Sequence, residues 1–470
     1  MNNEPSIVTE LDRKKALMVF LAIAFAFSLY QVLNLHYTIG DENIYYYMAK
    51  ETLQGNLPYK DFFFAHPPLQ LVGLMIFSVF GIIGMKITAL LYTLAIGYII
   101  FLILVEKGHK EAIIGAILFF TSHEILIHAL NPVGQDITAL FLVLGFYFYL
   151  KKSNLFAGIS FGLSALSGLY ALIIISTILM YDLVLKKDKK HFIDNCKGFF
   201  ISFGIGNIML ILLFGRKYID PVYVFQLIRP SGQANLSVFL EFLKYNLILF
   251  IGLIVYFLYK EKKKVIIAII LIFLIYLATS PSVFLHYYFL LIPFMVLAAS
   301  YSIASLINNK HNKHNNHKEP DDKNEKHSIY KTYTFALIVI AALVFSIINV
   351  HSTLQATRFS AAKNIANEIG AGKTVFGTDA ALIALLSDNR LPTKYLDSNL
   401  QRFRAGMGNV TEVISILNET GAYVITGEIQ TETTRQKRGL LYYKEYEDFL
   451  NNDCKLIEKN FDNYHWLYKC

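Results

Sequence analysis

Apolar residues gather along this chain in runs of roughly 16–22 residues, separated by short polar segments. A helix of about 20 apolar residues crosses the hydrocarbon core of a bilayer, which is about 30 Å thick. Because backbone groups in lipid must be satisfied within their own segment, such runs are expected to be helices. We predict membrane-spanning helices near residues 16–35, 86–105, 111–129, 135–150, 154–169, 170–185, 197–214, 243–259, 265–280, 286–307 and 333–351.

Two of the apolar segments need separate interpretation. Residues 154–185 lie between two lysine clusters, so the chain must cross the membrane twice there, turning near Ser167-Gly168. Residues 68–84 are apolar and uncharged, but a crossing there would reverse the charge bias of every later loop. We therefore predict that residues 68–84 form a helix that lies at, or dips into, the outer interface of the membrane.

The charged residues are few, and the basic ones have a regular placement. Only 17% of the chain is charged, which is low for a soluble protein of 470 residues. Basic residues cluster between apolar runs, at 13–15, 107–110, 151–152, 186–190, 260–264 and 310–331. Loops rich in Lys and Arg face the cytoplasm, so we predict a multi-pass protein of the plasma membrane with a cytoplasmic N-terminus. This placement accounts for the net charge of +8 without nucleic acid, which we exclude as a partner.

The composition changes to that of a soluble domain after residue 351. Parity of the crossings places residues 352–470 outside the cell, and their pattern is α/β. Strands are predicted at 374–377 and 422–427, and helices at 380–386 and 410–418. The predicted architecture is an all-α polytopic membrane bundle of about 11 transmembrane helices over residues 1–351, followed by a small extracytoplasmic α/β domain over 352–470. Within the bundle, the polar segment 308–328 contains His residues that could bind metal, but its composition favours a disordered connector.

Three cysteines are present, and two of them suggest a pair. Cys454 and Cys470 stand at equal distances from a turn predicted around Phe461-Asp462-Asn463, so they would face each other across a hairpin. A disulfide is expected in an extracytoplasmic domain, and the alternative is two free thiols. Cys196 lies at the inner end of a predicted helix and is expected only to pack there.

The first outer loop, residues 36–85, is unusually long for a connection within a helical bundle. Asp41 and Glu42 follow the first predicted helix closely, and adjacent carboxylates beside a membrane are unfavourable unless they are solvated, paired or functional. Asp41 could simply cap the helix that follows it. Capping does not explain why tyrosines, the segment 55–61 and His66-Pro67-Pro68 concentrate in the same loop.

The order Asp-Glu, Tyr, Gly-x-x-Pro-Tyr-x-Asp and His-Pro-Pro-Leu in this loop resembles the GT-C fold glycosyltransferases. The branch it is most similar to contains the protein O-mannosyltransferases and the lipid A aminoarabinose transferases. The resemblance covers the helical module to about residue 310. It implies that the sugar donor is a polyprenyl-phosphate monosaccharide and that Asp41, with Glu42 beside it, is catalytic. The resemblance also implies inversion at the anomeric carbon.

This chemistry suits a carboxylate. Phosphate is a good leaving group, so the reaction needs a base for the acceptor hydroxyl rather than a strong acid. The departing phosphate needs cations or N–H donors. The basic candidates at the outer face are His66, Lys86, Arg216, Lys217, Arg229 and His286. His66 and His286 match places where related enzymes carry a basic residue, although each could be a plain loop or interfacial histidine.

Three further loop residues are candidates for binding substrate. Tyr59 and Asp61 belong to the motif itself. Asp136 lies where the family places a second acidic residue, although a helix cap explains it equally well. Asp41, Glu42 and Asp136 could share a divalent cation, but no spacing in the chain reproduces a dedicated metal site.

Several departures from the family patterns bear on substrate. His66 stands where aminoarabinose transferases usually carry Lys, and Ser167-Gly168 replaces their Lys-Gly. The inserted β-domain of the mannosyltransferases is missing, which weakens a protein acceptor. The acceptor is therefore left open as an extracytoplasmic glycan, lipid or protein.

Two other functions remain as alternatives. A polysaccharide ligase or polymerase would use a diphosphate-linked glycan, but its large outer loop usually comes late in the bundle. A transporter would place charged residues or broken helices near the bilayer midplane, where the predicted helices carry almost no charge.

Overall fold

The computed structural model describes residues 10–230, 235–258, 264–281, 283–308, 348, 350, 356–430, 435–437, 439–458 and 465–470. The predicted connector at 308–328 and the predicted helix at 333–351 lie outside these residues except at 308, 348 and 350. The predicted turn at 461–463 lies wholly outside them.

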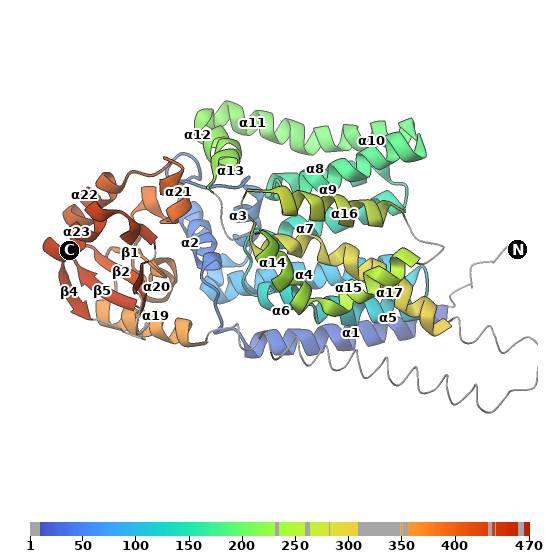
Figure 1. The fold of residues 1–470 in the computed structure, drawn as a ribbon, viewed down its shortest axis with the longest axis horizontal. Coiled ribbons are helices and arrows are strands. Elements are labelled where there is room, and N and C mark those ends of the chain that lie inside the picture. The colour runs from blue at the N-terminus through green and yellow to red at the C-terminus, as the bar shows by residue number, and fades with distance from the viewer. Residues whose placement is uncertain are drawn as a thin grey trace, which may run out of the picture.

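Helices form a bundle whose axes run roughly alongside one another (Figure 1). The bundle helices are α1 (Glu10–Leu33), α4 (Gly81–Val105), α5 (His109–Phe120), α6 (His123–His128), α7 (Asp136–Leu150), α8 (Asn154–Ser167), α9 (Ala171–Met180), α10 (Lys189–Phe199), α11 (Ile205–Phe214), α14 (Asn235–Tyr245), α15 (Leu247–Leu258), α16 (Lys264–Thr279) and α17 (Ile292–Asn308). Large apolar side chains are exposed on the outside of the bundle, as with Phe25 on α1 and Leu212 on α11. Such surfaces are stable in lipid and not in water.

Few of the described helices are long enough to cross a membrane unbroken. Glu10–Leu33, Ser78–Val105 and Lys189–Phe214 qualify by length and hydropathy, and α14 with α15 forms a fourth candidate bent by 90°. Elsewhere the predicted runs are interrupted, so that residues 111–129 form α5 and α6, and residues 286–307 form a 3-10 turn (Leu285–Leu290) before α17. The number of crossings stays a prediction.

The segment at 68–84 is divided. Its first part holds only α3 (Leu69–Leu74), whose six residues extend about 9 Å and do not span a membrane. Its last part, the 3-10 turn Ser78–Phe80 and the start of α4, belongs to the candidate span Ser78–Val105, which begins earlier than the helix predicted at 86–105. Val79 and Phe80 are exposed apolar side chains on this segment. The expected turn at Ser167-Gly168 separates α8 from α9.

Basic loops meet at the end of the bundle away from the C-terminal domain. Lys151, after α7, pairs with Glu106, after α4, and Arg13 of α1 lies close enough to influence Lys151. Figure 1 shows the C-terminus and its strands at the opposite end of the bundle from these loops. The end that carries the C-terminal strands is called the domain-facing end below.

Residues 356–470 combine helices with a five-stranded sheet. The helices are α19 (Ala356–Ile369), α20 (Ala380–Ser387), α21 (Leu400–Arg404), α22 (Val410–Thr420) and α23 (Lys444–Asn452), and the strands are β1 (Val375–Gly377), β2 (Tyr423–Gln430), β3 (Arg435–Lys437), β4 (Lys455–Glu458) and β5 (His465–Lys469). The strand order is β1-β2-β5-β4, with β3 pairing with β2. Among the described strands of this sheet, β1 and β2 pair in parallel and the other pairs are antiparallel. The four elements predicted in this region correspond to β1, β2, α20 and α22.

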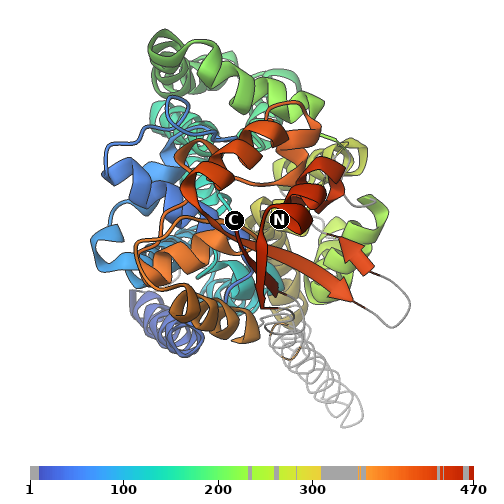
Figure 2. The ribbon, with the colours of Figure 1, turned by 90° about the vertical axis from the view of Figure 1, so that its left-hand side faces the viewer.

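The C-terminal domain rests on α2 (Asp41–Leu53), which follows the first bundle helix. Figure 2 views the molecule from this side, with the strands in front of the bundle. Helix α2 packs against α20, and Tyr47 and Met48 share a buried apolar cluster with Leu382. The Tyr47 hydroxyl accepts a hydrogen bond from the Leu391 backbone N–H at 3.1 Å. The loop after α1 is therefore held between the bundle and the C-terminal domain.

Cys454 and Cys470, the pair suggested by the sequence, form a disulfide with a sequence separation of 16. A cross-link that closes a loop of this size stabilises a domain by about 3 kcal/mol, because it restricts the unfolded chain. We expect Cys454→Ser with Cys470→Ser to lower the thermal midpoint of the C-terminal domain, measured by differential scanning fluorimetry. Cys196→Ser removes the free thiol of α10 and is the matched control, expected to leave that midpoint unchanged. An equal effect of both changes would contradict this role.

Candidate active site

Asp41 is the first residue of α2, and the cap position belongs to Gly40. The carboxylate of Asp41 is exposed to solvent and has no hydrogen-bond partner among the described residues. The interpretation of Asp41 as a plain helix cap is therefore wrong. Its side chain is left available at the domain-facing end.

Glu42 has the opposite environment, although it is the next residue. It is fully buried, and its carboxylate accepts hydrogen bonds from the Ile39 and Gly40 backbone N–H groups at 3.1 and 2.8 Å. The Thr38 hydroxyl and the Asn43 amide also donate to Glu42. These contacts cap the start of α2. Glu42 therefore holds the turn before α2, and its catalytic role, expected from the sequence, stays a prediction.

The surroundings of Asp41 alter its acidity. Packed protein removes part of its hydration, and this, with the neighbouring charge of Glu42, raises the pKa of Asp41 to about 6. Asp379 and Asp397 raise the pKa further, whereas Arg358 lowers it. Asp41 therefore remains mainly ionised at neutral pH but binds a proton more readily than a free aspartate.

Tyr45 lies one turn along α2 from Asp41 and contacts His66. The Tyr45 hydroxyl and His66 Nε2 are 3.2 Å apart. Burial, and then the positive charge of Arg229, lowers the pKa of His66 to about 4. The lowered pKa of His66 disfavours the partial positive charge expected from the sequence, and its role at a phosphate stays a prediction. His66 can still form hydrogen bonds at the site, as it does with Tyr45.

Arg229 supplies the cation that His66 does not. Its Nε donates to Gln401 Oε1 at 2.5 Å, and its Nη1 donates to the Tyr287 hydroxyl at 2.7 Å. Its guanidinium also lies 4.8 Å from the centre of the Phe284 ring. Among the residues that the structure describes, no carboxylate forms an ion pair with Arg229. A partly exposed guanidinium without an anionic partner is suited to a phosphate.

His286 lies beside this group. Its ring stacks on Phe284 with centroids 5.6 Å apart, and it stands 6.2 Å from the ring of His128. The Tyr287 hydroxyl next to it is hydrogen-bonded to both Arg229 and Tyr170. His286 therefore belongs to the aromatic surroundings of Arg229, and its direct role in binding substrate stays a prediction.

Tyr59 and Asp61 shape the loop instead of facing Asp41. Tyr59 is buried against Tyr218, and its hydroxyl donates to the His66 backbone carbonyl at 2.5 Å. Asp61 accepts a hydrogen bond from the Leu57 N–H at 2.8 Å. Their predicted contact with substrate is not supported, because these side chains are engaged in the turn itself.

Asp136 forms no hydrogen bond with Asp41 in the part of the chain that the structure describes. It is buried at the start of α7, where its charge acts on Tyr46 and Tyr92, and Glu42 acts on Tyr46 as well. The cap position of α7 belongs to Gln135, which makes no side-chain cap hydrogen bond, and one buried oxygen of the Asp136 carboxylate has no hydrogen-bond partner among the described residues. The capping interpretation of Asp136 is therefore not supported. Across the described ranges, no three His, Cys, Asp or Glu side chains are grouped as a metal site requires. The geometry therefore does not support a cation shared by Asp41, Glu42 and Asp136.

The remaining basic candidates lie away from this group or are already engaged. Lys86 is buried and donates to the Tyr37 carbonyl at 2.7 Å and to Asn131 Oδ1 at 3.0 Å. Arg216 and Lys217 are exposed on the short helix α12 (Arg216–Ile219). Of the six basic candidates, Arg229 is placed best for an anionic ligand, because its charge and that of Asp41 both act on Tyr45.

The C-terminal domain contributes three residues that sequence reasoning missed, namely Arg358, Asp397 and Gln401. Gln401 orients Arg229, while Arg358 and Asp397 act on the charge of Asp41. They lie in a region whose composition is that of an ordinary soluble domain. No local motif distinguishes them, and only the folded arrangement brings them to the first loop.

No family model matches the sequence, and no curated protein matches it. Solved structures do match. ArnT from Cupriavidus metallidurans in the apo state superposes with a TM-score of 0.65 at 10% identity, covering 97% of this chain and 98% of that one. ArnT is a lipid A aminoarabinose transferase with a GT-C fold. The chain has the GT-C fold.

The same ArnT bound to undecaprenyl phosphate superposes with a TM-score of 0.61 at 10% identity, covering 96% of this chain and 97% of that one. Identity at this level establishes the fold alone, so the branch and the reaction do not follow from it. The GT-C fold and the apolar helices support a membrane protein, as the hydrophobic pattern predicts.

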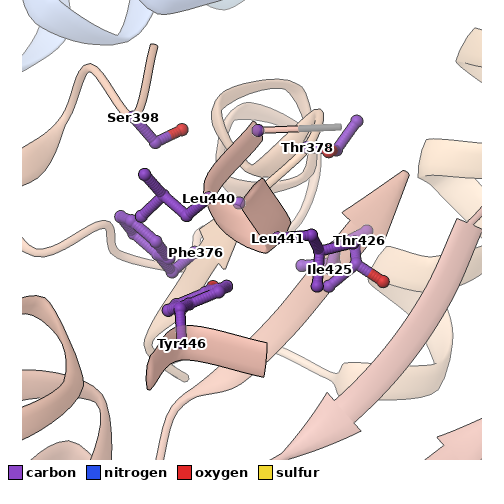
Figure 3. A pocket seen from close by; sticks show the side chains of 10 residues that line it. Phe376, Thr378, Ser398, Ile425, Thr426, Leu440, Leu441 and Tyr446 are labelled. Atoms are coloured by element: carbon purple, nitrogen blue, oxygen red, sulfur yellow. The ribbon is translucent and has the colours of Figure 1, made fainter. Parts of the chain in front are cut away.

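A small pocket of about 60 Å³ lies within the C-terminal domain, apart from Asp41. Figure 3 shows Phe376, Leu440 and Tyr446 around it. No Asp, Glu, His, Lys or Arg lines this pocket. It therefore lacks the groups for acid–base or phosphate chemistry, which are found around Asp41.

Proposed function

We propose that this protein is an inverting membrane glycosyltransferase that moves a monosaccharide from a polyprenyl-phosphate donor to an extracytoplasmic acceptor. The observation that carries the proposal is that an exposed carboxylate, Asp41, and a guanidinium, Arg229, both act on Tyr45 in a GT-C fold. Among the described residues, Asp41 has no hydrogen-bond partner and Arg229 forms no ion pair. The neighbour that binds undecaprenyl phosphate supports a lipid phosphate as the donor's carrier.

Asp41 acts as the general base in this proposal. The acceptor hydroxyl gives its proton to the Asp41 carboxylate as its oxygen bonds to the anomeric carbon. The bond between that carbon and the phosphate oxygen breaks on the opposite face, and the electron pair leaves with the polyprenyl phosphate. Because the attack and the departure take place on opposite faces, the configuration at the anomeric carbon inverts.

Arg229 stabilises the departing phosphate. Its Nε and Nη1 are oriented by Gln401 and Tyr287, so the guanidinium is held in place before charge develops. The hydroxyl of Tyr45 and the neutral ring of His66 add hydrogen-bonding groups nearby. A fixed cation and nearby donors favour the transition state, in which the phosphate carries more charge than in the bound donor.

The orientation in the membrane follows from the same proposal. The domain-facing end would lie outside the cytoplasm, with the basic loops near Lys107 and Lys151 inside. The donor headgroup would then reach Asp41 from the outer leaflet, and the C-terminal domain would stand on the acceptor's side.

Purified protein with radiolabelled polyprenyl-phosphate sugars tests this function. Wild-type protein should transfer sugar from at least one such donor to an acceptor or to water. Thin-layer chromatography measures the loss of the labelled donor. Undecaprenyl-diphosphate glycans are the comparison donors, because a ligase or polymerase would use those instead. Turnover of only the diphosphate donors would overturn the proposal.

The acid limb of the pH–rate profile reports the ionisation of Asp41. A base must be deprotonated, so a pKa of about 6 predicts that the rate falls as the pH drops through about 6. Below that value, the rate should fall about tenfold for each pH unit. Initial rates between pH 4.5 and 8 measure this limb. An acid limb near pH 4, the usual range of aspartate, would contradict the raised pKa of Asp41, and an acid limb that persists unchanged in the residual activity of Asp41→Asn would show that another group titrates.

A further inference from the structure

We propose that Arg358 of the C-terminal domain is a positioning residue for the reaction, because it fixes the turn from which Asp41 projects. The C-terminal domain then belongs to the catalytic unit instead of merely covering it. This inference rests on the proposed role of Asp41 as the base.

Arg358 reaches from α19 to the backbone immediately before Asp41. Its Nη1 donates to the Ile39 carbonyl, across 319 positions of sequence. Its guanidinium also lies directly against Gly40, the cap residue of α2. Glu42 binds the N–H groups of Ile39 and Gly40, so this turn is held on its N–H side by Glu42 and on its carbonyl side by Arg358.

Asp379 holds the guanidinium of Arg358 in this position. Arg358 Nε lies 2.7 Å from one oxygen of Asp379, and Nη2 lies 2.6 Å from the other. A two-point contact of this kind fixes the plane of the guanidinium. His465 Nε2, on β5, lies 3.1 Å from the same carboxylate. A continuous set of contacts therefore runs from the central sheet through Asp379 and Arg358 to the turn before Asp41.

Asp379 is charged over the whole working pH range. Burial pushes its pKa upward, but the His465 hydrogen bond and the Arg358 charge outweigh this and lower the pKa of Asp379 to about 2. The anchor for Arg358 is thus retained at every pH at which Asp41 titrates.

Gly40 shows how closely this contact is fitted. Its φ of +114° is a conformation that side chains rarely adopt. A Cβ at this position would also stand 2.5 Å from Nη2 of Arg358. Glycine suits the backbone conformation here, and a larger residue would also have to displace the guanidinium of Arg358.

Arg358 is the one cation among the charged groups that act most strongly on Asp41. The others are Glu42 on α2, Asp379 before α20 and Asp397 before α21, all of them acidic. Tyr45 also faces Asp41 from the next turn of α2. Removal of the Arg358 charge should therefore make Asp41 harder to ionise.

The experiment compares Arg358→Gln, Arg358→Lys and a matched control by two measurements on protein in nanodiscs. Asp388→Asn is the control, since it removes a different contact between the domain and α2, the ion pair of Asp388 with Lys50 at 3.3 Å. Hydrogen–deuterium exchange of peptides covering residues 38–48 reports the turn without any substrate. The pH–rate profile with the polyprenyl-phosphate sugar reports the base.

Arg358→Gln should speed exchange in residues 38–48 at least fivefold and move the acid limb up by about one pH unit. Arg358→Lys keeps the charge but not the two-point contact, so exchange should increase while the acid limb stays near its wild-type position. Asp388→Asn should match wild type in both measurements.

Unchanged exchange and an unchanged acid limb in folded Arg358→Gln protein would overturn the inference. If Arg358→Gln speeds exchange but wild-type protein transfers no sugar, the proposed function is overturned while the contact of Arg358 with the turn stands. Thermal unfolding of each variant shows whether the fold is retained, and Arg358→Lys tests the contact if Arg358→Gln fails to fold.

Discussion

Asp41→Asn is expected to lose about 10²- to 10⁴-fold in transfer rate, the usual contribution of a positioned general base. Asparagine has nearly the same shape as aspartate but does not accept the proton of the acceptor hydroxyl. Because Asp41 makes no hydrogen bond to the described residues, the substitution should leave the fold intact. Initial rates with a radiolabelled polyprenyl-phosphate sugar measure the loss, and binding of undecaprenyl phosphate should be preserved.

Asp61→Asn is the matched control for this result. Asp61 is a carboxylate in the same loop. It accepts a hydrogen bond from the Leu57 N–H, and the side-chain oxygen of asparagine can accept the same hydrogen bond. Its rate should stay within about twofold of wild type. Equal losses in both variants would indicate that loop stability, and not proton transfer, explains the effect at Asp41.

Arg229→Gln is expected to lower the rate by about 10²- to 10³-fold, the usual effect of removing one preorganised donor to a developing anion. Glutamine removes the charge while retaining a hydrogen-bonding side chain near Gln401 and Tyr287. Arg229→Lys keeps a positive charge but loses the planar guanidinium with its paired N–H donors, so its rate should lie between those of wild type and Arg229→Gln. Initial rates at saturating donor separate this effect from weaker binding.

Arg216→Gln serves as the comparison for Arg229, because Arg216 is exposed on α12 and lies outside the site. It should behave as wild type. If Arg229→Gln retained a full rate, phosphate stabilisation would have to come from other groups, with Lys86 and its contact to Asn131 the next to test.

Patterns along the chain were sufficient to predict the helical class and four of the C-terminal elements, whereas the loop that carries the site stays a prediction. The length of an apolar run indicates a helix that can lie in lipid, and the composition predicts that a soluble domain follows residue 351. The breaks within the helices were not predicted, such as the 90° bend between α14 and α15. Such a bend depends on packing against neighbours, and no proline or glycine marks it in the sequence.

The roles of adjacent residues in the loop were beyond sequence reasoning. Asp41 and Glu42 are both carboxylates, and only the conformation at Gly40 turns one toward solvent and the other into the turn. His66 was assigned partial charge because its usual pKa is near neutrality, whereas burial and Arg229 lower that pKa. The environment of a titratable group is a tertiary property.

Contacts made across the chain were missed for the same reason. Arg358 meets Ile39, and Gln401 meets Arg229, across 319 and 172 positions. A single sequence contains no signal for such pairs when neither partner lies in a recognisable motif. The C-terminal domain therefore looked like a separate unit, although its side chains complete the surroundings of Asp41.

An experimental structure of the protein in a nanodisc with undecaprenyl phosphate tests the central claim most directly. We expect the phosphate within hydrogen-bond distance of the Arg229 guanidinium, at the domain-facing end, with the Asp41 carboxylate on the side from which an acceptor would approach. A phosphate bound instead among the basic loops near Lys107 and Lys151, or an Asp41 side chain directed away from the lipid headgroup, would contradict the account.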